Sequence, residues 1–472
     1  MKIHTKRVTQ LFYVAVFFLS VLFRLDLAVL NREANDNHIA VIDFILLNEK
    51  LPKKDNCWEC FQPKLFHSTV ASTLTHTGFG RVTDNPDQRI VVAQLINFLA
   101  GVATLIVVWI FIKQFPLQNE KLKFLVFSLV ALNPPLIGIS AQATNDAFVI
   151  LFSTLSIYFG FVLLQRPKIS VLILLIIFAT LAISSKTNGW VAIIGIFMSI
   201  LVKAWKQPKQ RGKSLIFAMT FLLGVTLLAI LNPLTQYTFN YTKYGSPVVV
   251  NIERPPLPHL FEKTAIPDGG ILSIQDGFFT FHFFSLLAHP QIDYGDWNFT
   301  PQRTSFWTGL YGKSYSLHFD NYPPSWANSE EHVLMLSRGI FILAILPTIF
   351  LIIGAAIEVT TFVRSLFLKK TDTDLETQSF GLFIIIFVGY LAFLMLYALV
   401  YRDFTVTKAI FFFPALLSII VVGFSTGQRF YTTFSPGQNR WIIPVFEIGI
   451  STLLVFSVLD IILLIGQLQG QG

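Results

Sequence analysis

Long apolar runs separated by short polar or basic stretches dominate the pattern of this 472-residue chain. A helix that crosses the hydrocarbon core of a bilayer needs about 20 mainly apolar residues. About eleven segments meet that condition, and they are approximately 10–30, 89–112, 122–140, 146–164, 169–184, 189–203, 214–232, 337–363, 380–400, 407–424 and 442–466. The pattern therefore predicts an all-α polytopic membrane protein with about eleven transmembrane helices.

The first apolar run follows Lys2, Lys6 and Arg7, an arrangement that a cleaved signal peptide shares. It is longer than a typical signal core and lacks a small-residue cleavage site, so we interpret it as a membrane anchor. Composition agrees with a membrane protein, because 53% of the residues are hydrophobic and only 13% are charged.

The positions of the basic residues predict the orientation, because cytoplasmic loops retain Lys and Arg. With the N-terminus inside, every inside loop is basic. These loops carry Lys113, Lys121, Lys123, Arg166, Lys168, Lys203, Lys206, Lys209, Arg211, Lys213, Arg364, Lys369, Lys370, Arg429 and Arg440. The short outside connections hold only Lys186 and Arg402, with Lys408 opening the next span. The net charge of +8 therefore reflects topology, and no recognition motif suggests a nucleic-acid partner.

Two long segments fall outside the membrane in this arrangement. Residues 31–88 form the first outer loop of an N-terminal transmembrane module, 1–232. Residues 233–336 form a large non-cytoplasmic loop, whose Pro, Gly and aromatic content predicts an irregular cap, and residues 337–472 supply the C-terminal helices.

The first outer loop begins with polar residues that include Asp36 and His38. The apolar positions of residues 39–46 recur at helical spacing, which predicts an amphipathic helix on the outer leaflet. A carboxylate at this point could face a reacting group at the membrane surface. Alternatively, Asp36 caps the helix that follows.

The only two cysteines form a Cys57-Trp58-Glu59-Cys60 element. Such a pair can form a disulfide, contribute half of a metal site, or remain as inert thiols. We favour a disulfide in an oxidising compartment over a mixed metal site with His67. No cofactor is predicted, although Asp146 and His67 are candidate ligands of a divalent metal.

At the first outer loop the sequence resembles a known group of enzymes. An acidic residue directly after the first span, a helix ending at Leu51-Pro52, and Gln62-Pro63-Lys64-Leu65-Phe66 are similar to the first outer loop of bacterial glycosyltransferases of the C superfamily. Relatives include the dolichyl-phosphate-mannose protein mannosyltransferases and the lipid A aminoarabinose transferases. Those relatives usually have Asp-Glu and Gln-Pro-Pro-Leu-Tyr, where this chain has Asp36-Asn37 and Gln62 to Phe66.

Further elements that resemble this group follow in the same order along the chain. They are Asn133-Pro134-Pro135, Asn145-Asp146, Ser185-Lys186-Thr187-Asn188-Gly189, Phe306-Trp307-Thr308-Gly309-Leu310-Tyr311 and Lys408-Ala409-Ile410-Phe411-Phe412-Phe413-Pro414-Ala415.

The resemblance implies transfer of a hexosyl or pentosyl group from a polyprenyl-phosphate donor to a protein, lipid or glycan acceptor, with inversion. It implies a place in the bacterial inner membrane, with the active site facing the periplasm or exterior. Asp36 is the expected general base, because a neutral hydroxyl needs a proton acceptor to become a good nucleophile. The expected donor-binding residues are His38, Gln62, Asp146, Lys186, Arg402 and Lys408.

Other interpretations remain open at this point. Lys186, Arg402 and Lys408 could simply anchor helix ends at the interface, and Asp146 could cap its helix. A secondary transporter is the main alternative function, although transporters place ionisable residues near the bilayer midplane. A non-catalytic protein of envelope polymer assembly with the same fold is another.

Overall fold

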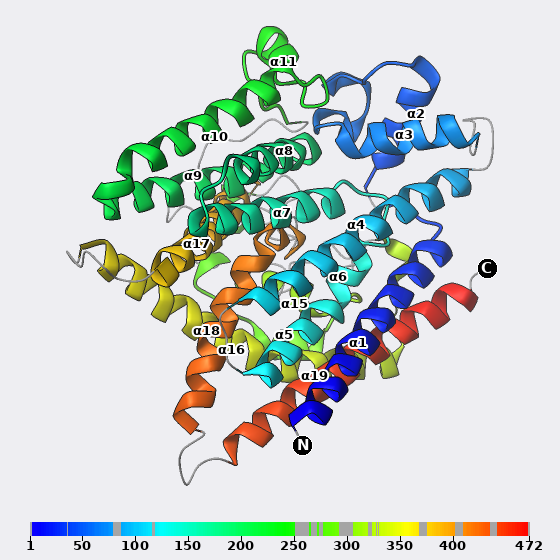
Figure 1. Ribbon diagram of the computed structural model, residues 1–472. Helices are drawn as coiled ribbons and strands as arrows, with labels where there is room; N and C mark the ends of the chain where they lie inside the picture. The colour runs from blue at the N-terminus through cyan, green and yellow to red at the C-terminus, as the bar shows by residue number, and fades with distance from the viewer. Residues whose placement is uncertain are drawn as a thin grey trace.

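The computed structural model describes residues 2–34, 36–78, 86–115, 119–250, 264–265, 271–272, 277–291, 305–319, 323–326, 328, 330–367, 375–401, 409–434 and 441–470 (Figure 1). Within these ranges the chain is almost entirely helical. Two short antiparallel strands, β1 (Thr264–Ala265) and β2 (Ile271–Leu272), pair with Thr264 opposite Leu272. The predicted all-α architecture is confirmed.

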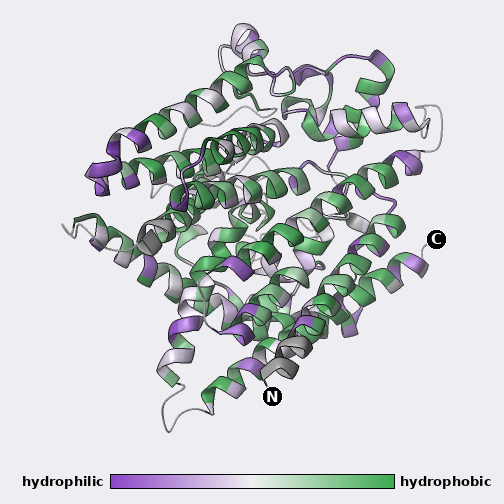
Figure 2. Ribbon diagram, viewed as in Figure 1, coloured by the Kyte–Doolittle hydropathy of each residue, from purple (hydrophilic) through white to green (hydrophobic). Residues whose placement is uncertain are grey.

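Nine helical segments in the described part of the chain are long and apolar enough to cross a membrane. They belong to α1 (Lys2–Leu30), α4 (Pro86–Gln114), α7 (Asp146–Gln165), α9 (Gly189–Lys206), α10 (Arg211–Leu231), α16 (Glu331–Phe367), α17 (Leu375–Tyr401), α18 (Leu416–Phe434) and α19 (Ile442–Gly470). Figure 2 shows apolar residues along these helices and polar residues gathered toward many of their ends. An integral multi-pass membrane protein is therefore confirmed.

The predicted count of about eleven spans is not confirmed, because two predicted spans form shorter helices. The segment 122–140 is divided into α5 (Glu120–Ala131) and α6 (Pro134–Ile139), and 169–184 forms α8 (Ile169–Ser185), which has 17 residues. Asn133 causes the division, since its side chain accepts a hydrogen bond from the Leu136 N–H at 2.9 Å. A residue that precedes proline also disfavours the helical conformation.

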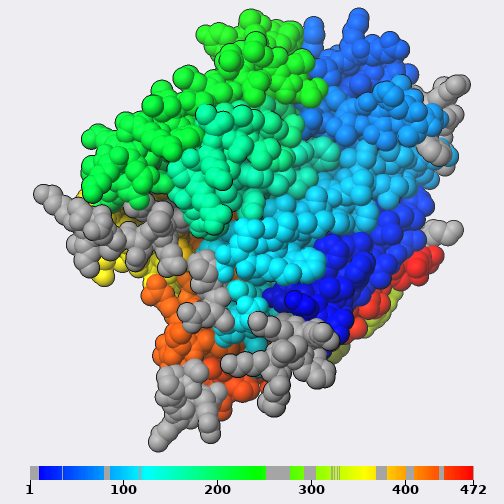
Figure 3. All heavy atoms as spheres, viewed as in Figure 1, coloured from blue at the N-terminus to red at the C-terminus, as the bar shows by residue number. Residues whose placement is uncertain are grey.

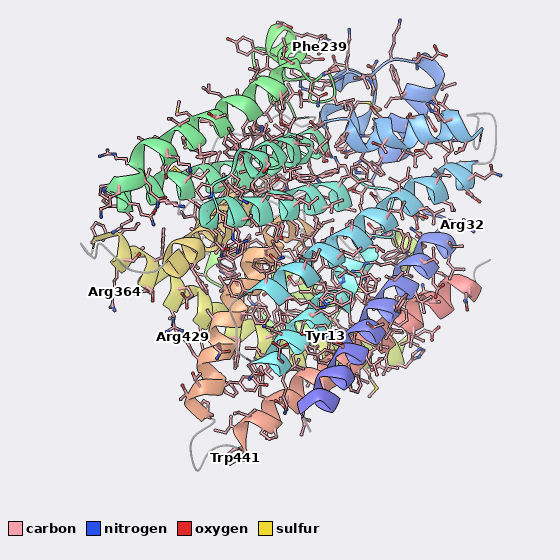
Figure 4. All side chains as sticks on the ribbon, in the orientation of Figure 1. Tyr13, Arg32, Phe239, Arg364, Arg429 and Trp441 are labelled. Carbon is pink, nitrogen blue, oxygen red and sulfur yellow. A yellow bond between two sulfur atoms is a disulfide. The ribbon has the colours of Figure 1, made fainter. Side chains whose placement is uncertain are left out.

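The two ends of the bundle differ in the residues they carry. Figure 4 shows Arg364, Arg429 and Trp441 at one end and Arg32 and Phe239 at the other, which we call the outer end. Arg429 lies in the last turns of α18 instead of in the predicted loop, since that helix continues to Phe434 and does not end near 424. It stays at the end of the bundle opposite the outer end (Figure 4), where its Nη2 pairs with Glu358 Oε1 of α16 at 2.7 Å.

The first outer segment folds over the outer end as two helices and two short turns. The predicted surface helix is present as α2 (His38–Asn48), which packs against α3 (Leu65–Thr77). Between them lie the 3₁₀ turns η1 (Lys54–Asn56) and η2 (Trp58–Phe61). A disulfide joins Cys57 to Cys60 across η2, with an Sγ–Sγ distance of 2.00 Å.

The remaining short elements complete the two ends of the bundle. They are η3 (Pro208–Gln210), α11 (Tyr237–Tyr244), α13 (Phe283–Ala288), α15 (Phe306–Tyr315), η4 (Pro324–Trp326), η5 (Ala409–Phe411) and η6 (Phe413–Ala415). Figure 3 shows the first outer segment and the α10–α11 region meeting at the outer surface. Hydrogen bonds join them, including Gln236 Nε2 to the Pro52 carbonyl at 2.8 Å and Lys64 N to the Leu234 carbonyl at 2.7 Å.

Part of the large outer loop is held against the outer ends of α1 and α19. The Ser325 N–H donates to Glu33 Oε2 at 2.8 Å, and its carbonyl accepts from Gln467 Nε2 at 2.9 Å. The buried His318 Nε2 lies 3.4 Å from Asp460 Oδ1 of α19. These contacts link Glu33, three residues before Asp36, to α19 through Ser325.

Candidate functional site

At the outer end, the beginning of α7 meets the end of α8 through a buried ion pair. Lys186 Nζ lies 2.7 Å from Asp146 Oδ1, and the two side chains are only 16% and 5% exposed. The Thr144 hydroxyl donates to the other carboxylate oxygen, Asp146 Oδ2, at 2.9 Å. The predicted candidates Asp146 and Lys186 are thus in direct contact.

Local chain geometry brings these two residues together. Helix α8 ends at Ser185, and Lys186 has an extended backbone with φ −157° that leads the chain away from the helix axis. Asp146 is the first residue of α7, where a carboxylate is favoured by the helix dipole. The N-cap is Asn145, so Asp146 does not cap α7 as the alternative interpretation had it. Lys186 Nζ also lies 4.7 Å from the centre of the Phe411 ring instead of extending to solvent.

Two buried histidines extend the set of polar contacts that begins at this ion pair. His38 Nε2 lies 3.3 Å from the Thr144 Oγ1, and His38 Nδ1 lies 2.9 Å from His67 Nε2 of α3. The two imidazole rings stack with their centres 5.2 Å apart, and neither is more than 1% exposed. His38, a predicted donor-binding residue, thus lies beside the Asp146–Lys186 ion pair, while its contact to His67 was not predicted.

Burial is the largest influence on both histidines, and it lowers the pKa of His38 and His67 below the usual 6.5. The carboxylates of Glu59, Asp36 and Asp146 act on His38 in the opposite direction. A negative charge near a histidine favours the imidazolium, so these carboxylates partly offset the effect of burial on the pKa of His38.

Gln62 joins the same region from the first outer segment. The Asn145 side-chain amide donates to Gln62 Oε1 and, at 3.0 Å, to the Ser185 carbonyl. Gln62 Nε2 in turn donates to Glu59 Oε2, and Glu59 is only 6% exposed. Sequence reasoning missed Glu59 and Asn145 as members of the site. The sequence contained a signal for Glu59, because a carboxylate within a four-residue turn between two cysteines has little room to reach solvent.

Lys64 fixes the turn that presents Gln62. Its fully buried ammonium donates to the carbonyls of Cys60, at 2.7 Å, and Gln62. Burial lowers the pKa of Lys64 to about 7. The cation at the end of a helical turn satisfies carbonyls that lack partners within the turn.

Asp36 lies six residues beyond the end of α1 and one residue before the N-cap of α2. Its φ of +48° is in the left-handed region, which Asp adopts more readily than most residues. The N-cap is Asn37, which forms no side-chain capping bond, so Asp36 does not occupy the capping position. The other nearby acids are engaged elsewhere, since Glu33 accepts from Ser325 and Asp43 pairs with Arg89 at 2.8 Å.

Two predicted donor-binding residues, Arg402 and Lys408, lie outside the described residues. The predicted metal pair is not brought together, because His67 contacts His38 and Asp146 contacts Lys186 and Thr144. A mixed Cys/His site is ruled out in this state, since the disulfide occupies both sulfurs. The described ranges contain no group of three or more His, Cys, Asp or Glu side chains arranged to hold a metal ion.

Comparison with known proteins gives one family match. The family of dolichyl-phosphate-mannose-protein mannosyltransferases matches residues 79–232, about a third of the chain, including Asp146 and Lys186. No curated protein sequence matches the chain significantly.

Several solved structures are similar over parts of the chain. The Pmt1-Pmt2 protein O-mannosyltransferase complex of S. cerevisiae, bound to the sugar donor, has 15% identity and a TM-score of 0.38, covering 51% of this chain and 34% of that one. The oligosaccharyltransferase AglB from Archaeoglobus fulgidus has 10% identity and a TM-score of 0.48, covering 97% and 56%. ArnT from Cupriavidus metallidurans has 12% identity and a TM-score of 0.36, covering 88% and 78%.

The chain thus spans about a third of the length of the first of these proteins and just over half of the second. All three TM-scores are below 0.5, so these likenesses do not bear on the assignment. The assignment rests on the family match and on the apolar helices of the described residues. Together they confirm a multi-pass membrane protein that over residues 79–232 is similar to the dolichyl-phosphate-mannose-protein mannosyltransferases, one of the groups that the sequence resembles.

Proposed function

We propose that the protein is a membrane glycosyltransferase that moves a sugar from a polyprenyl-phosphate donor to an acceptor hydroxyl, with inversion, on the non-cytoplasmic side. The observation that carries this proposal is the buried Asp146–Lys186 ion pair, which Thr144 joins to His38 at the outer end of the bundle, with Asp36 two residues before His38. The family match over residues 79–232 supports a lipid-phosphate sugar as donor.

In this proposal Asp36 is the general base. The acceptor oxygen forms a bond to the anomeric carbon as the bond from that carbon to the phosphate oxygen breaks. The proton of the acceptor hydroxyl passes to the Asp36 carboxylate, and the phosphate leaves with the bonding electron pair. Proton removal by a positioned carboxylate is typically worth about a hundredfold to ten-thousandfold in rate.

The donor phosphate would bind beside Lys186, together with Arg402 and Lys408. Lys186 pairs with one oxygen of the Asp146 carboxylate. An ammonium has three N–H donors, so Lys186 retains donors for a phosphate oxygen. Positive charge at this point stabilises the charge that grows on the leaving phosphate. His38 and Gln62 would contact the sugar, and Asp146 would hold Lys186 in place.

The test uses membranes that contain the full chain and a panel of labelled polyprenyl-phosphate sugars. We expect transfer from at least one donor, with the opposite anomeric configuration in the product. Asp36→Asn keeps the side-chain size but removes the proton acceptor, so we expect normal insertion, retained donor binding and at least about a hundredfold slower transfer. Asp146→Asn should retain more activity than Asp36→Asn.

A matched control is Asp55→Asn, which changes an exposed carboxylate in the same outer segment. Transfer by Asp36→Asn at close to the parent rate would exclude Asp36 as the base. If the parent protein transferred sugar from none of the donors, the proposed glycosyltransferase activity would be rejected. A role in envelope polymer assembly would then be favoured.

A further inference from the structure

A short segment of the large outer loop exposes several aromatic side chains close together. Residues 277–291 contain five phenylalanines and no Asp, Glu, Lys or Arg. Phe279, Phe281 and Phe284 are 83%, 48% and 84% exposed, and we call these three residues the phenylalanine face. The rings of Phe281 and Phe284 each lie 6.1 Å from the ring of Phe283. Single exposed apolar residues are common, but neighbouring ones that form a patch mark an interaction surface.

The packing of α13 fixes the level of this face along the bundle. In α16, which begins at the large outer loop, residues 339–357 carry no charged side chain. They are therefore the part that crosses the hydrocarbon, with Arg338 at its outer edge. Arg338 Nε donates to the Leu287 carbonyl of α13 at 2.8 Å, and the fully buried Leu286 lies in one cluster with Phe341. Helix α13 thus lies where the hydrocarbon begins.

At this level α13 adjoins a face of α16 that lipids cover. Met335, Ile342 and Ile349 are exposed and recur every seven residues, so they lie on one face of the helix. Arg338 lies on the same face, three residues after Met335 and four before Ile342. Its bond to Leu287 therefore places α13 at the outer end of an exposed apolar stripe, and the phenylalanine face continues the lipid-facing surface.

The irregular backbone before α13 finds hydrogen-bond partners within the protein. Side chains at the start of α15 bond three of its backbone groups, with Trp307 Nε1 donating to the Phe278 carbonyl at 2.7 Å, Ser305 Oγ donating to the Thr280 carbonyl at 2.6 Å, and Thr308 Oγ1 accepting from the His282 N–H at 2.8 Å. Backbone groups that have no water available need such partners, whereas those of a loop in solvent do not.

An uncharged aromatic face at the edge of the hydrocarbon is stabilised when lipid covers it, because burial of apolar surface is favourable. We propose that the phenylalanine face inserts into the acyl chains of the outer leaflet. Residues 277–288 then form an interfacial element of the outer loop that does not cross the membrane. This inference rests on the membrane-spanning helices and is independent of the proposed glycosyltransferase activity.

Acyl chains suit this face better than a folded partner protein does. A protein interface usually combines an apolar centre with a polar rim and forms about one hydrogen bond per 100–200 Å². Residues 277–291 carry no charged side chain for such a rim apart from what their two histidines can provide, and α15 and α16 already bond several of their backbone groups. Acyl chains require no hydrogen bonds.

Insertion at this point would connect the bilayer to the candidate functional site. The segment is bonded to the start of α15, and α15 packs against η5. The ring of Phe411 in η5 lies 4.7 Å from Lys186 Nζ. The phenylalanine face thus tethers to the outer leaflet a series of contacts that ends at the Asp146–Lys186 ion pair.

The first test identifies what covers Phe284. The photoreactive residue p-benzoyl-phenylalanine is placed at position 284 of the full chain, which is reconstituted in dioleoylphosphatidylcholine vesicles with and without a polyprenyl phosphate. After irradiation we expect the peptide that contains residue 284 to gain the mass of one phospholipid in both kinds of vesicle. The same residue at position 241 is the control, because Tyr241 is exposed on α11 at the outer end, and it should gain no lipid.

Three outcomes of this test would overturn the proposal. They are a cross-link to a second copy of the chain, an adduct with the polyprenyl phosphate in place of the phospholipid, and the absence of a lipid adduct at position 284. The first would assign the face to an interface between copies, and the second would assign it to a polyprenyl chain.

The second test measures depth in the same phosphatidylcholine vesicles. Both native cysteines are held in the disulfide, so Phe279→Cys and Phe284→Cys can each take a nitroxide label. Collisions of the label with a water-soluble nickel complex should be at least about tenfold rarer than at Tyr241→Cys, because a polar complex enters hydrocarbon at high cost. Collisions with oxygen, which dissolves in lipid, should approach those at Ile349→Cys. Labels at both positions that are as accessible to nickel as at Tyr241→Cys would overturn the inference, whether or not sugar transfer were observed.

Discussion

Breaking the Asp146–Lys186 ion pair should cost more than breaking an exposed pair of similar geometry. At an Nζ–Oδ1 distance of 2.7 Å, the attraction at an effective dielectric constant near 20 is roughly 6 kcal/mol. Desolvation of both groups offsets much of this attraction. Removing one partner leaves the other buried without its counter-charge, which typically costs about 3–5 kcal/mol.

The assay is a double-mutant cycle with the parent, Asp146→Asn, Lys186→Gln and the double variant. Reversible unfolding in mixed micelles gives the free energy of unfolding of each protein. We expect each single variant to lose about 3 kcal/mol, and the double variant to lose less than the sum by about 2 kcal/mol.

A matched control is the pair of Lys243 Nζ and Asp55 Oδ2, 2.9 Å apart, whose side chains are 44% and 59% exposed. Its coupling free energy should be below about 1 kcal/mol, because solvent screens exposed charges. The reasoning is refuted if the Asp146–Lys186 coupling is no larger than that of the control. Such a result would mean that Asp146 does not hold Lys186 in place.

Three further predictions concern stability and topology. Burial lowers the pKa of both histidines in the folded state, so the unfolded state binds more protons below pH 6.5; the protein should lose stability as the pH falls below about 6.5, and thermal unfolding of His67→Gln should show a smaller loss. Replacing both cysteines by serine should lower the free energy of unfolding by about 2 kcal/mol, as expected for a short loop, with intrinsic turnover changed less than twofold in the fraction that remains folded. In that cysteine-free background, single cysteines at Gln207 and Tyr241 should react with a membrane-impermeant reagent from opposite sides of the membrane, and labelling from the same side would refute the predicted topology.

The sequence predicted single elements of the site better than it predicted their contacts. Asp146 and Lys186 were candidates because Asp146 opens a span and Lys186 follows one, each at an outer connection. Their ion pair could not be foreseen, because it depends on how α7 and α8 pack across 40 residues of sequence. Thr144 escaped notice and Asn145 was recognised only as part of the Asn145-Asp146 element, because neither carries a charge, although both hold charged or amide partners in place.

The prediction of spans failed where hydropathy averaged over a long segment hid a local signal for the start of a helix. Asn133-Pro134-Pro135 carries the usual marks of a helix start, yet the apolar residues on both sides concealed it within one predicted span. At Arg429 the reverse happened. A charged residue suggested a helix end, but Glu358 on a neighbouring helix neutralises that charge.

The attachment of the large outer loop to α1 and α19 has a consequence for biosynthesis. Glu33, three residues before Asp36, is held by Ser325, which in turn is held by Gln467 on the last described helix. A ribosome releases α19 long after the first outer segment has been made. The chain just beyond the end of α1 therefore acquires its final support only after α19 has inserted, so nascent chains arrested before α19 should contain Asp36 without a completed site around it.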